Sequence, residues 1–216
     1  MNELVTKKPE HETIYLQVKE MILFGEFIPG QPLTIHGLAE TIGTGVTPAR
    51  EAIRRLTAEG ALVTLENRRI EVPAITEHRL KQIDLVRLTV EPELAERAAF
   101  HCKPKDIEEL ERLDQLVDQS IQVGDIRGYL EANYQFHFHL YGLANAQILR
   151  RIAETLWLRI GPSLRVVCGR YGTANLTDHH REALDALRIG DAARTREAIA
   201  QDIRQGMEFV RQSYEN

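Results

Sequence analysis

The chain has 216 residues, of which 43% are hydrophobic and 27% charged, so it can build one or two packed domains and is not disordered throughout. Its formal net charge of −5 argues against a protein that coats nucleic acid without sequence preference, because such binding requires a basic surface. Apolar runs stay below the roughly 18–20 residues that cross a bilayer, the N-terminus lacks the apolar stretch of a secretory signal, and the two cysteines form no disulfide-type or metal-type pair, so we expect a cytoplasmic protein without membrane contact.

The N-terminal region is predicted to begin with two short helices. Residues 11–27 carry apolar side chains at helical spacing and a glycine stop at Gly25. A turn built on Pro and Gly follows at residues 28–33. Thr34 is then expected to cap a second helix that ends at Gly43.

A third helix is expected to start at Thr47 and to end at Gly60. Thr47 would cap this helix, and Pro48 would occupy its first position, where the missing N–H costs nothing. The buried stripe of this helix is predicted to comprise Ala52, Ile53 and Leu56.

A small β-hairpin is predicted to follow the third helix. Residues 62–65 and 70–72 read as two short strands, with a polar turn between them and Pro73 at the end. We therefore expect a domain boundary at this point, with one domain over residues 1–75 and a second over residues 76–216.

The second domain is predicted to be an antiparallel all-α bundle of about six helices, which makes the whole chain mainly α. Short breaks between helical segments indicate antiparallel neighbours. The expected helices are Glu77–His101, Lys105–Val123, Ile126–Leu143, Gln147–Arg170, Thr177–Ile189 and Ala192–Ser213.

Three helices and a hairpin indicate a winged helix-turn-helix, whose third helix would enter the major groove of double-stranded DNA. Arg50 and Arg54 lie four residues apart, so both can point away from the apolar stripe. Arginine is suited to a paired contact with guanine. Thr47 and the free N–H groups of the first turn favour a phosphate, and Arg68 and Arg69 at the hairpin tip suit the minor groove.

Charge is concentrated on this predicted reading surface. From Arg50 to Arg69 the chain holds five arginines and three glutamates, a local excess of two positive charges in an acidic protein. An Arg-x-x-x-Arg pair on a helix is usually only a solvated face. Its coincidence with a helix-turn-helix layout and an arginine-tipped hairpin favours DNA binding.

The first domain resembles the DNA-binding domain of GntR-type bacterial transcription regulators over about Ile14 to Val72. The shared motifs are Gly-x-x-x-Pro-Gly-x-x-Leu from Gly25, Leu38-Ala39-Glu40, Thr47-Pro48-x-Arg50-Glu51-Ala52, Arg54-Arg55-Leu56 and Glu59-Gly60. The resemblance implies DNA contacts by His36, Thr47, Arg50, Arg54, Arg68 and Arg69. Members usually carry Ser-Arg before the Thr-Pro, whereas this chain has Gly45-Val46, so it lacks both a polar side chain and a positive charge there.

The helical domain holds four candidate metal ligands: Asn133, His137, His180 and Asp202. The first two lie four residues apart, on one helix face. His180 and Asp202 lie 10 and 12 residues on either side of Gly190, so an antiparallel helix pair would place them at similar heights. Two imidazoles with oxygen ligands suit zinc, nickel or manganese. The competing interpretation is that each histidine is an ordinary surface or hydrogen-bonded residue.

The same domain resembles FCD, the all-helical effector domain of the FadR branch of the GntR family. The resemblance lies in "VRLTVEPELAERAA", "LEANYQFHFHLYGLANAQIL" and "HREALDALRIGDAARTREAIAQDI". Metal-binding members have an Asp and a His four apart, followed by two further histidines, and these align with the four candidates. Here Asn133 replaces the Asp and Asp202 replaces the last His, so reduced metal affinity or a metal-free site is expected.

The resemblance further implies a small organic acid as effector and repression as the commoner mode of action. Arg87 and Arg165 are candidate partners for the acid, with structural ion pairs as the competing role.

We therefore expect a ligand-responsive transcription regulator that binds operator DNA as a homodimer, since one reading helix covers only a half-site. The alternative is a metal-dependent hydrolase or lyase on the helical bundle, although no general base can be named for it. A third alternative is a module that only dimerises. The arrangement of the arginines is the one feature of the sequence that argues against it.

Overall fold

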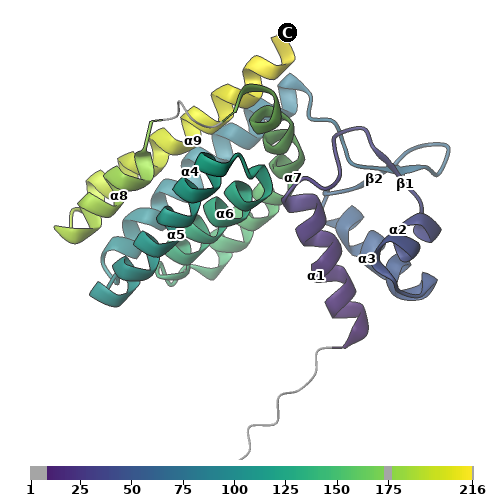
Figure 1. Cartoon of the computed structure of the whole chain (residues 1–216), viewed down its shortest axis with the longest axis horizontal. Coiled ribbons are helices and arrows are strands. Elements are labelled where there is room, and N and C mark those ends of the chain that lie inside the picture. The colour runs from purple at the N-terminus through teal and green to yellow at the C-terminus, as the bar shows by residue number, and fades with distance from the viewer. Residues whose placement is uncertain (1–8, 173–176, 216) are drawn as a thin grey trace, which may run out of the picture.

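A computed structural model describes residues 9–172 and 177–215, and in this part of the chain the fold is mainly α, as predicted. Three helices and a small sheet form the N-terminal region on the right of Figure 1, and six helices form a bundle on the left. Residues 1–8 of the predicted first domain lie outside the described residues. The N-terminal elements are α1 (Glu10–Leu23), β1 (Pro32–Leu33), α2 (Ile35–Ile42), α3 (Val46–Ala58), β2 (Val63–Thr64) and β3 (Ile70–Glu71).

Helix α2 begins and ends as the sequence predicts. The Thr34 hydroxyl accepts a hydrogen bond from the Gly37 N–H at 2.9 Å, which caps the first turn. Gly43 ends the helix in the left-handed conformation, with φ of 66°, which glycine adopts without strain.

The predicted start of α3 is wrong by two residues. The extended backbone of Gly45 makes it the N-terminal flanking residue, and no side chain caps the helix. Thr47 therefore lies inside the first turn. Pro48 becomes the third helical residue, and its missing N–H still costs nothing because the first four N–H groups of a helix have no intrahelical partner.

The predicted stripe of α3 is buried, together with Ala49, and it packs against α1 and α2. This packing leaves the opposite side of α3 facing solvent, which decides which of its arginines are available to a partner.

The predicted hairpin is present, but the sheet has a third strand that the sequence analysis missed. Strand β3 pairs antiparallel with β2 and also with β1, in the order β1-β3-β2. Strand β1 lies within residues 28–33, which were predicted to be only a turn. A two-residue strand has too little pattern to be recognised in a sequence. Its partner strand also lies almost 40 residues further along the chain, so no local signal links the two.

The six bundle helices are α4 (Glu77–Ala99), α5 (Pro104–Val123), α6 (Ile126–Gly142), α7 (Gln147–Tyr171), α8 (His179–Arg188) and α9 (Ala192–Glu215). Helices α5 and α6 pack together, as do α6 and α7, and α8 and α9. The break at Lys103-Pro104 does not produce such a pair, because α4 packs mainly against α9 and α7. The loose break expected after residue 171 leads into residues 173–176, which lie outside the described part.

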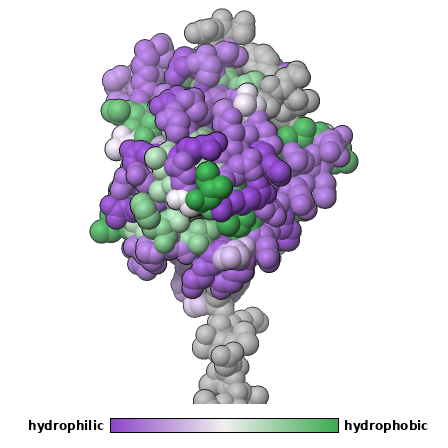
Figure 2. Space-filling view, turned by 90° about the vertical axis from the view of Figure 1, so that its left-hand side faces the viewer, coloured by the Kyte–Doolittle hydropathy of each residue, from purple (hydrophilic) through white to green (hydrophobic). Residues whose placement is uncertain are grey.

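The side of the bundle shown in Figure 2 is mainly hydrophilic, and its hydrophobic side chains form separate patches. Across the described residues, the helices are too short or too polar to cross a membrane.

Helix α7 joins the bundle to the N-terminal region. It packs against α1, and Gly161 of α7 is buried at this contact. A Cβ at Gly161 would lie 2.3 Å from the Leu23 carbonyl oxygen, which belongs to the backbone and cannot swing aside. The close approach of the two helices therefore requires glycine at this position.

We expect Gly161→Ala to lower the free energy of unfolding by about 1–3 kcal/mol, because the added methyl group forces two backbones apart. Gly206→Ala in α9 is the matched control, since a Cβ there meets nothing within 4 Å. It should raise the stability by up to about 1 kcal/mol through helix propensity. Urea unfolding measures both variants, and equal stabilisation by both would contradict the proposed close contact.

Candidate functional site

The N-terminal end of α3 presents a polar side chain, a cation and free backbone donors to solvent. Thr47 and Arg50 are both exposed. Within the described part of the chain, no hydrogen bond or ion pair occupies the Arg50 side chain. Because no side chain caps α3, the N–H groups of its first turn are also available. This end of the helix can therefore bind an anion without first breaking contacts of its own.

The next two arginines of α3 differ in what they contact. Arg54 is 70% exposed and binds both carboxylate oxygens of Glu51 on the same helix, at 2.9 and 2.7 Å. An ion pair this exposed is screened by water and salt and contributes little, so a phosphate or base can replace it. Arg55 instead binds Glu12 at 2.6 Å and stacks on the Tyr15 ring, 3.6 Å from its centroid. Arg55 thus fastens α3 to α1.

The remaining predicted DNA contacts lie on exposed positions at either side of α3. His36 is exposed on the first turn of α2. Arg68 and Arg69 are exposed at the tip of the hairpin, where Arg68 has a φ of 61° and the Leu65 N–H donates to the Arg69 carbonyl at 2.8 Å. The turn therefore holds both arginines outward.

In the bundle, three of the four candidate metal ligands converge. Nε2 of His137 lies 3.1 Å from Oδ2 of Asp202 and 3.3 Å from Nε2 of His180. His180 and Asp202 approach to 3.9 Å, in agreement with their equal heights on α8 and α9. The rings of His137 and His180 are buried, and Asp202 is partly exposed.

Hydrogen bonds behind the two rings decide which nitrogen atoms carry protons. Tyr141 donates its O–H to Glu91 at 2.8 Å, so its oxygen accepts from Nδ1 of His137 at 3.0 Å. Nδ1 of His180 donates to the Asp114 carboxylate at 3.1 Å. When the rings are neutral, both Nε2 atoms therefore carry lone pairs, which face each other and a carboxylate.

Burial and neighbouring charges shift the pKa values of His137, His180 and Asp202 in different directions. Burial lowers the pKa of His137 in spite of its contact with Asp202. Burial also opposes a charge on His180, but its hydrogen bond to Asp114 and the charges of Asp202 and Asp114 outweigh burial and raise its pKa. Asp202 has a lowered pKa, because its contacts with His137 and the positive charge of Arg87 outweigh burial. The site thus keeps its carboxylate ionised.

The donor set fits a divalent metal ion. Three lone-pair atoms that face one another at 3.1 to 3.9 Å repel unless a proton or a metal ion lies between them. Ligand atoms at about 2.0–2.1 Å from one tetrahedral zinc ion are separated by about 3.3–3.4 Å, close to the spacings observed. Together the three side chains offer two nitrogen ligands and one carboxylate.

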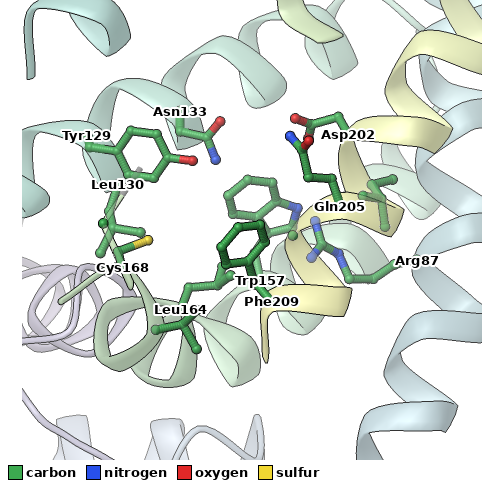
Figure 3. A pocket seen from close by; sticks show the side chains of 14 residues that line it. Arg87, Tyr129, Leu130, Asn133, Trp157, Leu164, Cys168, Asp202, Gln205 and Phe209 are labelled. Carbon is green, nitrogen blue, oxygen red and sulfur yellow. The ribbon is translucent and has the colours of Figure 1, made fainter. Parts of the chain in front are cut away.

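Two hollows meet beside these ligands. One is a cavity of about 50 Å³ with an apolar wall that includes Trp157 and Phe209, and the other is an open hollow of about 180 Å³ next to His180. The residues that line both are Tyr129, Asn133, Asp202 and Gln205. In Figure 3, Asn133 and Asp202 face each other across this polar rim, so Asn133 borders the site beside the three converging groups.

The two predicted effector arginines lie in different surroundings. Arg87 lines the smaller cavity and is 3% exposed, but Nε and Nη2 bind Glu91 at 2.6 and 3.3 Å. Only Nη1, 3.5 Å from Sδ of Met207, remains for a ligand. The stem of Arg165 packs instead on Gly25 at the end of α1, and Arg165 is not among the residues that line either hollow. The structure thus gives the predicted effector contact of Arg165 no support.

The residues that orient the two histidines were not predicted from the sequence. Asp114 occupies a core-facing position of α5 beside Leu110 and Val117, and this acidic residue in an apolar stripe was the available signal. Tyr141 lies four residues after His137 on the same helix face. A tyrosine in a helix is usually an apolar packing residue, so its role follows only from its contact with Glu91.

Comparison with known proteins assigns both regions. Residues 10–72 match the model of bacterial regulatory proteins of the gntR family, and residues 83–205 match the FCD domain. The chain is 30% identical to the HTH-type transcriptional regulator McbR of Escherichia coli K12, over 97% of this chain and 98% of McbR. It is 25% identical to a probable D-xylose utilization operon transcriptional repressor of Paenarthrobacter nicotinovorans, over 93% and 90% of the two chains.

Solved structures show the same arrangement. The structure of E. coli McbR/YncC superimposes with a TM-score of 0.90 at 27% identity and covers 96% of this chain and 100% of that one. A putative GntR regulator from Rhodococcus sp. RHA1 has the same fold, with a TM-score of 0.76 at 20% identity over 94% and 98% of the chains. The matched relatives carry the names of transcriptional regulators, so the alternative of a hydrolase or lyase gains no support.

We expect Arg87→Met to lower the free energy of unfolding by about 3–5 kcal/mol, because it leaves the buried Glu91 carboxylate without its cation. Arg97→Met is the matched control, since Arg97 pairs with Glu93 at the same helical spacing but in an exposed position. It should cost less than about 1 kcal/mol. Thermal or urea unfolding compares the two variants, and equal costs would show that Glu91 tolerates the removal of its cation.

Proposed function

The chain belongs to the gntR family of bacterial regulatory proteins and is a transcriptional regulator with an FCD domain, and on this premise we propose a function for each of its two domains. Residues 1–75 form the DNA-reading domain, and residues 76–216 form the domain that binds an effector and holds two chains together. The observation that supports DNA reading by the first domain is the free, outward-facing Arg50 at the uncapped start of α3.

We propose that α3 enters the major groove with its N-terminal end. Arg50 then contacts guanine, and Thr47 with the first-turn N–H groups binds a phosphate. Arg54 also contacts the DNA, after its guanidinium releases the Glu51 carboxylate. Among the described residues, nothing requires glycine at position 45, since a Cβ there meets only Pro48, at 3.6 Å. We propose that glycine at this position allows the DNA backbone to approach the start of α3 closely. His36, Arg68 and Arg69 are assigned flanking contacts.

Arg50→Ala should weaken binding to a specific duplex by about 1–3 kcal/mol in each half-site, because the paired hydrogen bonds to guanine are no longer made. Arg112→Ala, which removes the same charge from the bundle surface, is the control and should bind normally. Fluorescence anisotropy at fixed salt, on a duplex selected from a random pool, measures both. Equal affinities for the two variants would remove Arg50 from the interface.

For the bundle, we propose that His137, His180 and Asp202 hold a divalent metal ion, with zinc, nickel or manganese as candidates and Asn133 as a weak fourth ligand. The bound ion would supply a positive centre for the carboxylate of a small organic acid. Nη1 of Arg87 and the polar rim would bind the acid's other end. The small cavity favours an acid of few heavy atoms.

His180→Ala should abolish tight zinc binding, and Asp114→Asn should weaken it about 10–100-fold, because Asp114 orients the ring and makes Nε2 a better ligand. The control is His179→Ala, which alters the adjacent histidine outside the converging set. Isothermal titration with zinc measures all three. Unchanged binding by His180→Ala would show that any bound metal uses other ligands.

We also propose that the regulator is a cytoplasmic homodimer, because operator DNA lies in the cytoplasm and each chain carries one reading helix. Helices α4 and α7 pack together, and both expose large apolar side chains: Leu85 and Val86 on α4, and Ile148 and Ile152 on α7. These suit a contact with a second copy. Repression is our proposed mode of action, in line with the name of the Paenarthrobacter relative.

A further inference from the structure

Helix α7 contacts both the bundle cavity and the DNA-reading region within a few residues. Trp157 lines the cavity and donates to the buried Glu91 carboxylate at 2.8 Å. Two residues later, Arg159 reaches out of the bundle to the end of α3. The spacing places the two side chains on different faces of one helix.

The Arg159 guanidinium binds the last turn of the reading helix directly. Its Nε and Nη2 both donate to the carbonyl oxygen of Glu59, at 3.2 and 3.0 Å. Glu59 is the residue that ends α3, so its carbonyl has no intrahelical donor. A cation at this end of the helix is also favoured by the helix dipole. Arg159 thus satisfies an exposed carbonyl at the end of α3 that is opposite to the proposed DNA contacts.

The residues around Glu59 favour its contact with Arg159. Gly60 has a φ of 74°, and a Cβ there would lie 2.6 Å from Nη2 of Arg159, so a larger residue would both strain the backbone and crowd the guanidinium. On its other side, Glu59 accepts a hydrogen bond from the Tyr15 hydroxyl at 2.6 Å. Glu59 is therefore held by α1 and by α7 at once.

Two other contacts between α7 and the N-terminal region lie at the end of α1. Leu23 meets Gly161, and Gly25 meets Arg165. These two contacts fasten α7 to the end of α1 and do not involve α3. Arg159 is the α7 side chain that reaches α3 itself. An open hollow of about 640 Å³, lined in part by Gly60, Ile75 and Arg79, lies beside it, so the bundle and the N-terminal region are not tightly packed here.

We propose that Arg159 is a positioning residue for operator recognition: it holds the C-terminal end of α3 on α7 and so fixes the direction in which the reading helix leaves the bundle. The proposal rests on the proposed function of a dimer that reads two half-sites. In such a dimer, the angle between bundle and reading helix sets the spacing of the two helices. Without the Arg159 hydrogen bonds, binding of a full operator should weaken much more than binding of one half-site.

The experiment compares Arg159→Ala and Arg159→Lys with Arg151→Ala, which removes the same charge from an exposed position of the same helix. Each variant is titrated, by fluorescence anisotropy at fixed salt, with a selected operator and with a duplex that holds one half-site. Thermal unfolding and zinc binding are measured alongside. Hydrogen exchange then reports on the backbone N–H groups of residues 60–62 and 74–76.

For Arg159→Ala we expect about tenfold weaker binding of the full operator, because both reading domains are then without these hydrogen bonds. Half-site affinity, melting temperature and zinc binding should stay close to those of Arg151→Ala, and exchange at 60–62 should be faster. Arg159→Lys should recover most of the affinity, because its ammonium group can still donate to the carbonyl.

Three outcomes would overturn the proposal. Full-operator affinity of Arg159→Ala equal to that of Arg151→Ala would show that the contact positions nothing. Equal weakening on the half-site and on the full operator would make Arg159 a direct contact or a stabiliser of α3 alone. A large drop in melting temperature, with no recovery in Arg159→Lys, would reduce its role to stability. Failure of the wild type to bind any selected duplex would instead reject the proposed function itself.

Discussion

The buried carboxylate of Glu91 is the interaction on which the bundle depends. It is fully buried, and it accepts hydrogen bonds from Arg87, Tyr141 and Trp157, which come from three different helices. A buried charge is tolerated only when it is paired and hydrogen-bonded, so these three side chains are held in place by the same requirement. Because Tyr141 must donate to Glu91, it accepts from His137, and the proton arrangement of the proposed metal site follows from a carboxylate that does not touch it.

The same network links the core to the surface that faces the reading domain. Trp157 belongs to α7, the helix that carries Gly161 and Arg159 against α1 and α3. The buried contact at Gly161 leaves little space for α7 to slide along α1. A ligand that displaced Trp157 would therefore act on the helix that holds the reading domain. The chain thus combines a polar core with a direct connection to its DNA-binding surface.

The arginines of the third helix show how far sequence reasoning reaches. Their spacing and the apolar stripe behind them predicted that Arg50 and Arg54 would face outward, and both are exposed. The pattern gave no indication that Arg55 stacks on Tyr15, because that contact joins positions 40 residues apart. Likewise, the heights of His180 and Asp202 could be estimated from the turn at Gly190, whereas Asp114 was missed because its partner lies on another helix.

The sequence by itself determined the helices, most of their ends, the hairpin and the family resemblance, because helical spacing, capping and turn residues act over a few neighbouring positions. The tertiary structure decided the start of α3, the third strand, the protonated nitrogens of the two histidines and the contact of Arg159 with Glu59. Strand pairing and side-chain hydrogen bonds join residues that are distant in the chain and meet only after the helices pack. The uncapped start of α3 depends on a local backbone conformation that the Thr-Pro signal did not reveal. The local pattern therefore specified the parts, and packing specified the chemistry of the sites.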